Sequence, residues 1–217
     1  ERYGRVVAEA FMYRSHPQTL EVRRMVAEGE LGRVRFVRGS FTCTIGPDDA
    51  YRFDPAMGGG SLWDVGCYPL SYARAALAAE PLEAFGWQTP GPTGVDLGFA
   101  GQLRFPDEVH AQFDCSYILP YHVFMEIVGE DATLVVPQPF NPGMPEKLYL
   151  MRPGKKTARI LVKGAPCYQG EVEDMADAIL EGKPPRVSLA DSRANTAAIL
   201  ALFESARTGK AVAIEPA

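Results

Sequence analysis

The sequence predicts an α+β domain in which helices cover one face of a large antiparallel or mixed sheet. Seven runs rich in strand-forming residues follow one another between residues 82 and 163, with no helical pattern between them. Helical patterns lie before and after this block. The 217 residues are 47% hydrophobic and show neither an internal repeat nor a clear linker, so we expect one core.

The part of the chain before the sheet predicts a strand, a surface helix, a second strand and a long helix. Residues 5–13 form a short apolar run that suits a buried strand, although its length does not exclude a helix. A helical stripe begins at Pro17 and meets stop signals at Gly29 and Gly32. The next predicted elements are a strand at 34–45, a loop at 46–60 and a helix from Ser61 to about residue 79.

The predicted strands of the central block are separated by turn residues such as Pro106 and Asp107. Their ranges are 82–88, 96–105, 108–118, 122–129, 132–137, 147–151 and 158–163. Two helical patterns follow, at 169–185 and 188–210. The second starts with Ser188 and Asp191, close to a capping box, and stops at Gly209. Residues 211–214 are a candidate last strand.

Charge and cysteine content narrow the classes of function. The formal net charge is -5 and no run of Lys or Arg is long, which argues against binding nucleic acid or an anionic membrane. No stretch approaches the roughly 18 apolar residues of a membrane span. The four cysteines form no C-x-x-C pair, and His110 and His122 have no third ligand in register, so we expect no metal and a reduced, cytoplasmic protein.

The triple glycine Gly58–Gly60 lacks the G-x-G-x-x-G spacing of a dinucleotide fold, so this chain has no nucleotide cradle of its own. Its plainer interpretation is a loop that lets backbone pack close to the start of a helix.

Asp64 and Tyr68 are four residues apart, so a helix projects both from one face and they can reach the same ligand. The alternative is that Asp64, three residues after the cap candidate Ser61, only favours the helix start, while Tyr68 packs into the core. Pro69 frees the carbonyl of Val65 and tends to bend the helix there.

Three further polar residues lie on predicted loops, where binding residues are common. They are Arg14, His16 and Arg52. Each could equally be a solvated side chain.

Several motifs in order resemble the C-terminal domain of the glucose-fructose oxidoreductase and inositol dehydrogenase family. They are MYRSHPQ, then EGELG-x-V-x-x-V, then YRFDPAMGGGSLWDVGCYPLSYARAAL followed by EP. The likeness is to the branch with dihydrodiol dehydrogenase and sugar dehydrogenases, and it continues more weakly to residues 205–210. It implies a large, mostly antiparallel, open-faced sheet with helices on one face, and a homodimer through the open face.

The resemblance also implies an NAD(P)-dependent oxidoreductase acting on a sugar, polyol or related secondary alcohol. Residues 1–15 would be a remnant of the last strand of an absent Rossmann domain and its crossover, and residues 16–217 the substrate-binding and dimerisation domain. NAD or NADP would be bound mainly by the absent domain, so this chain alone would be inactive. The alternative is a non-catalytic sugar-binding or regulatory module of the same fold.

Carried over residue by residue, the resemblance makes Tyr68 the proton donor or acceptor and Asp64 the group that orients the substrate. Arg14, His16, Arg52 and Gly60 become candidates for substrate binding.

Overall fold

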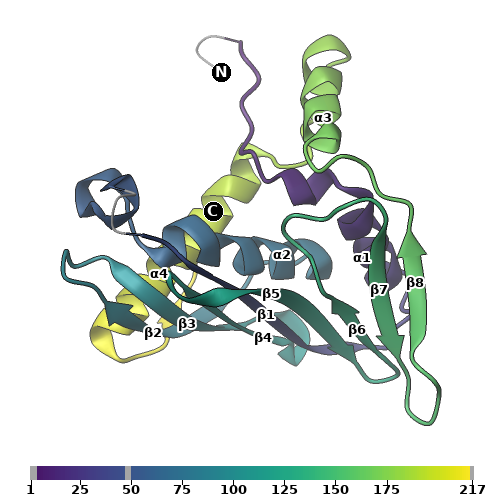
Figure 1. Ribbon diagram of the computed structural model, residues 1–217, viewed down its shortest axis with the longest axis horizontal. Coiled ribbons are helices and arrows are strands. Elements are labelled where there is room, and N and C mark those ends of the chain that lie inside the picture. Colours follow the sequence, from purple (N-terminus) through teal and green to yellow (C-terminus); the bar gives the residue numbers. More distant parts are fainter. Residues whose placement is uncertain (1–3, 47–49, 216–217) are drawn as a thin grey trace.

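The computed structural model describes residues 4–46 and 50–215, and within these ranges the strands form one nine-stranded sheet (Figure 1). The strand order is β8-β7-β6-β5-β1-β4-β3-β2-β9. The strands are β1 (Val34–Thr44), β2 (Glu83–Pro90), β3 (Asp96–Arg104), β4 (His110–Ser116), β5 (Ile118–Gly129), β6 (Thr133–Val136), β7 (Glu146–Met151), β8 (Ala158–Val162) and β9 (Val212–Ala213). Neighbouring strands are antiparallel except β1 and β4, which are parallel, so the predicted sheet is confirmed.

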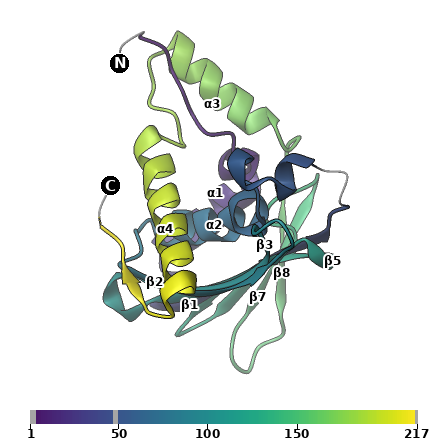
Figure 2. The same cartoon turned by 90° about the vertical axis from the view of Figure 1, so that its left-hand side faces the viewer.

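The helices lie on one side of this sheet, as predicted (Figure 2). They are α1 (Pro17–Ala27), α2 (Cys67–Leu77), α3 (Gln169–Leu180) and α4 (Leu189–Thr208). Figures 1 and 2 show α3 standing farthest from the sheet, beyond the layer that contains α1, α2 and α4. The opposite face of the sheet carries no helix in the described part of the chain.

Burial alternates along the strands because successive side chains point to opposite faces. On β5, Val123, Met125 and Ile127 are buried under the helices, whereas Phe124 and Glu126 point to the open face and are partly exposed. The same alternation along the other strands gives one apolar core between sheet and helices.

The predicted ends of α4 are confirmed. The Ser188 hydroxyl oxygen accepts a hydrogen bond from the amide of Asp191 at 3.1 Å, and Gly209 ends the helix in the left-handed conformation.

The predicted strand at residues 5–13 is wrong for the described residues. Residues 4–11 are extended without a strand partner, and Met12–Ser15 form a 3₁₀ turn. Phe11 and Tyr13 supply the apolar character that suggested a strand, but they are buried against helices and loops. In the predicted loop at 46–60, Ala50–Phe53 and Pro55–Met57 form short 3₁₀ turns, while residues 47–49 lie outside the described ranges.

Candidate active site

The helix that carries Asp64 and Tyr68 begins with a π-helical turn, Leu62–Gly66, which continues directly into α2. Pro69 explains the wide turn, because its ring would crowd the carbonyl of Val65 in a regular α-helix and it has no N–H to donate. The irregularity near this proline is a π turn, and the predicted bend of the helix axis stays a prediction. Single π turns within helices often occur at functional sites.

Asp64 forms an ion pair with Arg52, whose Nε lies 2.7 Å from Oδ2 of the carboxylate. Both side chains are about one quarter exposed, at 28% and 25%. Arg52 sits in the 3₁₀ turn Ala50–Phe53, and its guanidinium group also lies over the ring of Tyr51. The structure thus brings together two of the residues that the sequence singled out, and their formal charges balance.

Tyr68 lies one helical turn further on, among the aromatic rings of Phe11, Phe41 and Phe140. Ring centroids are 5.3 to 5.7 Å from that of Tyr68, and all three contacts are edge-on. Its side chain is half-buried. Burial raises the pKa of Tyr68 to about 12, with smaller contributions from nearby groups that include Asp64. The phenol therefore keeps its proton near neutral pH and can act as a proton donor.

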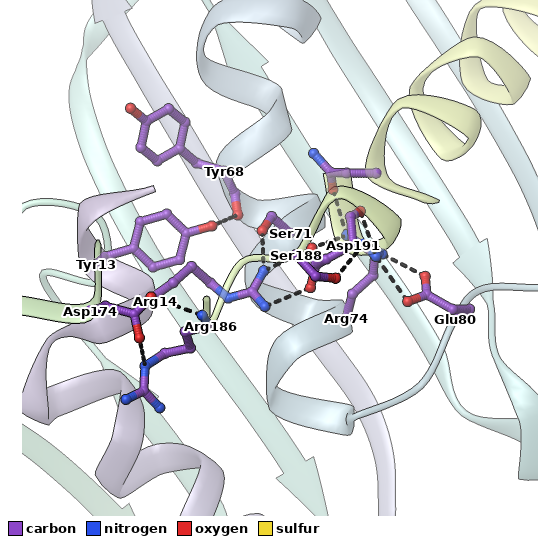
Figure 3. Close-up of polar contacts among 11 residues, drawn as sticks. Tyr13, Arg14, Tyr68, Ser71, Arg74, Glu80, Asp174, Arg186, Ser188 and Asp191 are labelled. Atoms are coloured by element: carbon purple, nitrogen blue, oxygen red, sulfur yellow. Dashed lines mark hydrogen bonds and ion pairs between the residues drawn. The ribbon is translucent and has the colours of Figure 1, made fainter. Parts of the chain in front are cut away.

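The main-chain oxygen of Tyr68 accepts a hydrogen bond from the Tyr13 hydroxyl at 3.2 Å. Figure 3 shows the Tyr68 side chain pointing away from the polar network that lies on the other side of Tyr13. Tyr13 is fully buried and its ring stacks on that of Tyr72. The helical backbone at Tyr68 is therefore held by the Tyr13 hydroxyl, while the Tyr68 phenol points away from the polar network.

Arg14 belongs to that separate network (Figure 3). It is buried, and its guanidinium group donates to Ser71 at 2.7 Å and to Asp191 at 2.8 Å. Arg74 contacts the same Asp191 carboxylate at 3.1 Å and Glu80 at 2.6 Å. The network joins the turn Met12–Ser15 to α2 and α4, so the structure gives Arg14 partners within the fold and does not bring it to Asp64.

His16 is also built into the fold. It is 1% exposed, its Nδ1 accepts from the amide of Gln18 at 3.1 Å, and its Nε2 lies 3.0 Å from the carbonyl oxygen of Ala165. Burial lowers the pKa of His16, so the ring is neutral and caps α1. Among the described contacts, neither Arg14 nor His16 reaches Asp64 or Tyr68, in contrast to Arg52.

The glycine loop serves close packing, as its plainer interpretation held. A Cβ atom on Gly60 would lie 2.2 Å from Oδ1 of Asp96, and one on Gly59 would lie 2.5 Å from the carbonyl oxygen of Arg52. Gly60 also has a φ of +121°, which disfavours other residues. These two glycines approach the protein's own atoms, so they do not form an open cradle for a dinucleotide phosphate.

Two residues near the helix start were missed by the sequence analysis. Asp96 accepts from the Ser61 hydroxyl at 2.6 Å and from the Leu62 amide at 2.8 Å. Ser61 lies at the N-cap position as predicted, but its hydroxyl makes no capping bond to the helix and donates to Asp96 instead. Tyr117 donates to the carbonyl oxygen of Gly60 at 2.9 Å. Both partners are distant in sequence, and Asp96 resembles an ordinary turn residue at the start of a strand.

Tyr168 and Glu171, at the start of α3, also make small contributions to the raised pKa of Tyr68. Local sequence patterns do not reveal this contribution, because α3 lies more than 100 positions away in the chain.

Within the described ranges, no group of three or more His, Cys, Asp or Glu residues is arranged to hold a metal ion. His110 stacks on Phe36 and His122 lies against Phe124. None of the helices in the described part of the chain is long and apolar enough to cross a membrane.

The family model for the GFO/IDH/MocA C-terminal domain matches residues 19–135 of this chain. Over 99% of its length the chain is 34% identical to D-xylose 1-dehydrogenase (NADP(+)) 2 of Haloferax volcanii, and over 96% it is 33% identical to an oxidoreductase of Rhizobium meliloti. It spans 66% and 65% of the length of these two relatives.

Two solved structures share the fold. Aldose-aldose oxidoreductase from Caulobacter crescentus, complexed with glycerol, superposes with a TM-score of 0.90 at 24% identity, covering 98% of this chain and 65% of that one. A 3-ketoreductase from Actinomadura kijaniata, in complex with NADP and TDP-benzene, superposes with a TM-score of 0.86 at 25% identity. The superposition covers 94% of this chain and 63% of that one.

Proposed function

Because the chain belongs to the GFO/IDH/MocA family, we propose that it is the substrate-binding and dimerisation part of an NAD(P)-dependent oxidoreductase. The reaction would transfer a hydride to or from a sugar, polyol or related secondary alcohol. The names of its relatives support this choice, since they include a D-xylose 1-dehydrogenase and a dTDP-sugar 3-reductase of Streptomyces violaceoruber.

The observation that carries the proposal is the half-buried phenol of Tyr68 beside the carboxylate of Asp64. When a hydride reaches a carbonyl carbon, the oxygen becomes negatively charged and needs a proton. Tyr68 has a pKa of about 12 and so holds a proton at neutral pH. In the direction of reduction it would donate that proton to the substrate oxygen.

Asp64 and Arg52 would orient the substrate. The carboxylate can accept hydrogen bonds from sugar hydroxyl groups, and the guanidinium group can donate to them. With an acceptor and a donor 2.7 Å apart, the pair suits a ligand with several hydroxyl groups, such as a polyol. We propose structural roles for Arg14, His16 and Gly60, whose contacts lie within the fold.

The dinucleotide would supply the hydride, and we propose that it is held mainly by a part of the protein outside these residues. The tight packing of Gly59 and Gly60 against Arg52 and Asp96 supports this, because these two glycines directly before the helix are filled by the protein's own atoms. For the oxidation direction the Tyr68 phenolate needs a neighbouring positive charge, which the same outside part would provide. We propose residues 1–15 as the connection to it and residues 16–217 as the substrate domain.

The open face of the sheet is the proposed dimer surface. Trp87 is 58% exposed there, and a hollow of about 270 Å³ beside it is lined by residues that include Arg38, Asp114 and Phe124. Aromatic residues around shallow hollows are typical of protein interfaces.

The four cysteines are free thiols, which agrees with a reducing, cytoplasmic location.

The decisive test compares Tyr68→Phe with Tyr72→Phe in the full-length protein, assayed with NADH and NADPH against a panel of sugars and their keto forms. Tyr72 is a buried tyrosine one turn away, so it controls for the loss of a hydroxyl group. We expect turnover to fall by about 10²-fold or more only in Tyr68→Phe, as for a lost general acid. Saturable sugar binding without turnover in the unaltered protein would favour the non-catalytic module instead.

A further inference from the structure

A carboxylate from a distant strand holds the start of the helix that carries Asp64 and Tyr68. Asp96, the first residue of β3, accepts from Ser61 and Leu62 at 2.6 and 2.8 Å. The first amides of a helix lack partners within it, so an acceptor at this point stabilises the helix start. We propose that Asp96 is a positioning residue that fixes this helix start on the sheet and thereby sets the directions of Asp64 and Tyr68.

Asp96 lies in the interior. It is 2% exposed, and its Oδ1 has no hydrogen-bond partner among the described residues. Burial raises the pKa of Asp96, while its bonds from Ser61 and Leu62 act in the opposite direction. Burying a carboxyl group with an unpaired oxygen is unfavourable. In several proteins, buried polar groups of this kind fix one arrangement of neighbouring elements.

Gly60, the residue before Ser61, packs closely against the Asp96 carboxyl group, which is the anchor of the helix start. Gly60 leaves the space that the Asp96 carboxyl group occupies, since a Cβ atom would lie 2.2 Å from Oδ1. Its carbonyl oxygen accepts from Tyr117, which directly follows β4, and its amide donates to the carbonyl oxygen of Arg52 at 3.0 Å. The backbone is therefore attached on one side to the sheet and on the other to the turn that supplies Arg52.

The π turn Leu62–Gly66 lies between this anchor and Tyr68. Leu62 and Val65 are buried, whereas Asp64 is partly exposed, so the turn already has a defined inner and outer face. Without the anchor the first residues of the turn, Ser61 and Leu62, lose their hold on the sheet and can shift, which changes the direction of Asp64 relative to Tyr68. Asp96 acts on the reaction through this geometry, because its own contacts are internal.

Trp63 offers a direct readout. It lies in the same π turn, and its ring centroid is 6.0 Å from that of Phe203 on α4. The chain has two tryptophans, and the other, Trp87, is exposed on the open face. A Trp87→Phe background therefore leaves Trp63 as the single tryptophan of this 217-residue chain, so emission excited selectively from tryptophan reports on the helix start.

In that background, Asp96→Ala is compared with Asp96→Asn and with Thr42→Val. Thr42→Val is the control, because it removes another side-chain hydrogen bond of the sheet, which the buried Thr42 donates to the carbonyl oxygen of Pro120 at 2.6 Å. We expect Asp96→Ala to shift Trp63 emission to longer wavelength and to increase its quenching by acrylamide. Asp96→Asn keeps an acceptor oxygen and should retain the parent spectrum, as should Thr42→Val.

A folded Asp96→Ala variant, checked by circular dichroism, that keeps the parent emission of Trp63 would overturn the proposal. Should that variant not fold, Ser61→Ala takes its place, because it removes one of the two bonds to Asp96. A shift in the same direction then supports the positioning role, and an unchanged spectrum overturns it.

The effect on catalysis rests on the oxidoreductase function proposed above. In the full-length enzyme we expect Asp96→Ala to lower kcat/KM by on the order of 10²-fold, mainly through kcat, since small displacements of catalytic groups have effects of that size. Asp96→Asn should restore most of the activity. A full-length protein without oxidoreductase activity would refute the proposed function alone, because the Trp63 measurement decides the positioning role independently.

Discussion

Arg14 donates to Asp191 at 2.8 Å across a separation of 177 positions in the sequence. Arg74 shares the same carboxylate at 3.1 Å, and both arginine side chains are almost completely buried. One carboxylate at the start of α4 thus joins α2 to the turn that carries Tyr13. This contact lies on the inner side of the helix from which Tyr68 projects.

We expect Asp191→Ala to be strongly destabilising. It leaves two buried guanidinium groups without the carboxylate they share, and removing one partner of a buried ion pair costs about 3–5 kcal/mol. Urea unfolding followed by circular dichroism measures the change. Glu204→Ala is the control, since Glu204 pairs with Arg207 on the surface, and it should leave stability nearly unchanged. Equal losses for the two variants would contradict a structural role for the network.

The glycine loop gives a second prediction about stability. Gly58 and Gly60 both have positive φ angles, of +72° and +121°, but a Cβ atom on Gly58 meets nothing within 4 Å. Gly58→Ala should therefore cost only about 1–2 kcal/mol, the cost of the left-handed backbone. Gly60→Ala adds the collision with Asp96 and should cost clearly more in the same urea unfolding measurement. Similar losses would mean that the carboxyl group of Asp96 can move aside.

Alkaline pH should destabilise the protein through its buried phenols. Burial raises the pKa of Tyr13, Tyr72 and Tyr117, and that of Tyr68 to about 12. Above about pH 10 the unfolded chain loses these protons while the folded protein keeps them, so unfolding becomes more favourable as pH rises. The urea concentration at the unfolding midpoint should thus decrease as the pH is raised from about 9 to about 11, and this decrease should be smaller in Tyr72→Phe. A midpoint that stays constant over this range would contradict the burial of these groups.

The sequence was sufficient for the parts of the fold that local patterns determine. The alternation along residues 122–129 and the cap at Ser188 are properties of short segments, and both are present in the structure. The first apolar run was misassigned because a strand needs a neighbour, and none pairs with residues 4–11 in the described part of the chain. A short apolar run carries no information about that neighbour.

The candidate site also contains some residues that local sequence can predict and others that depend on distant partners. Asp64 and Tyr68 are four positions apart, so local spacing alone predicts that they project from one helix face. Asp96 meets Ser61 from 35 positions away, and nothing in its local sequence marks it as the group that anchors the helix. Arg14 shows the opposite case, because a loop position suggested ligand binding until the distant partner Asp191 was known.

The open face of the sheet yields the last prediction, which concerns assembly. If a second copy covers this face, Trp87→Glu places a charge in a desolvated apolar interface and should convert the dimer to a monomer. Val172→Glu is the matched control, since Val172 is a similarly exposed apolar residue at 64%, but on α3. Sedimentation velocity of the three proteins at equal concentration decides between the outcomes. A monomeric parent protein would exclude the open face as the dimer surface, because no second copy would then cover it. Dissociation in Val172→Glu alone would also exclude it, because the contact between the two copies would then involve α3.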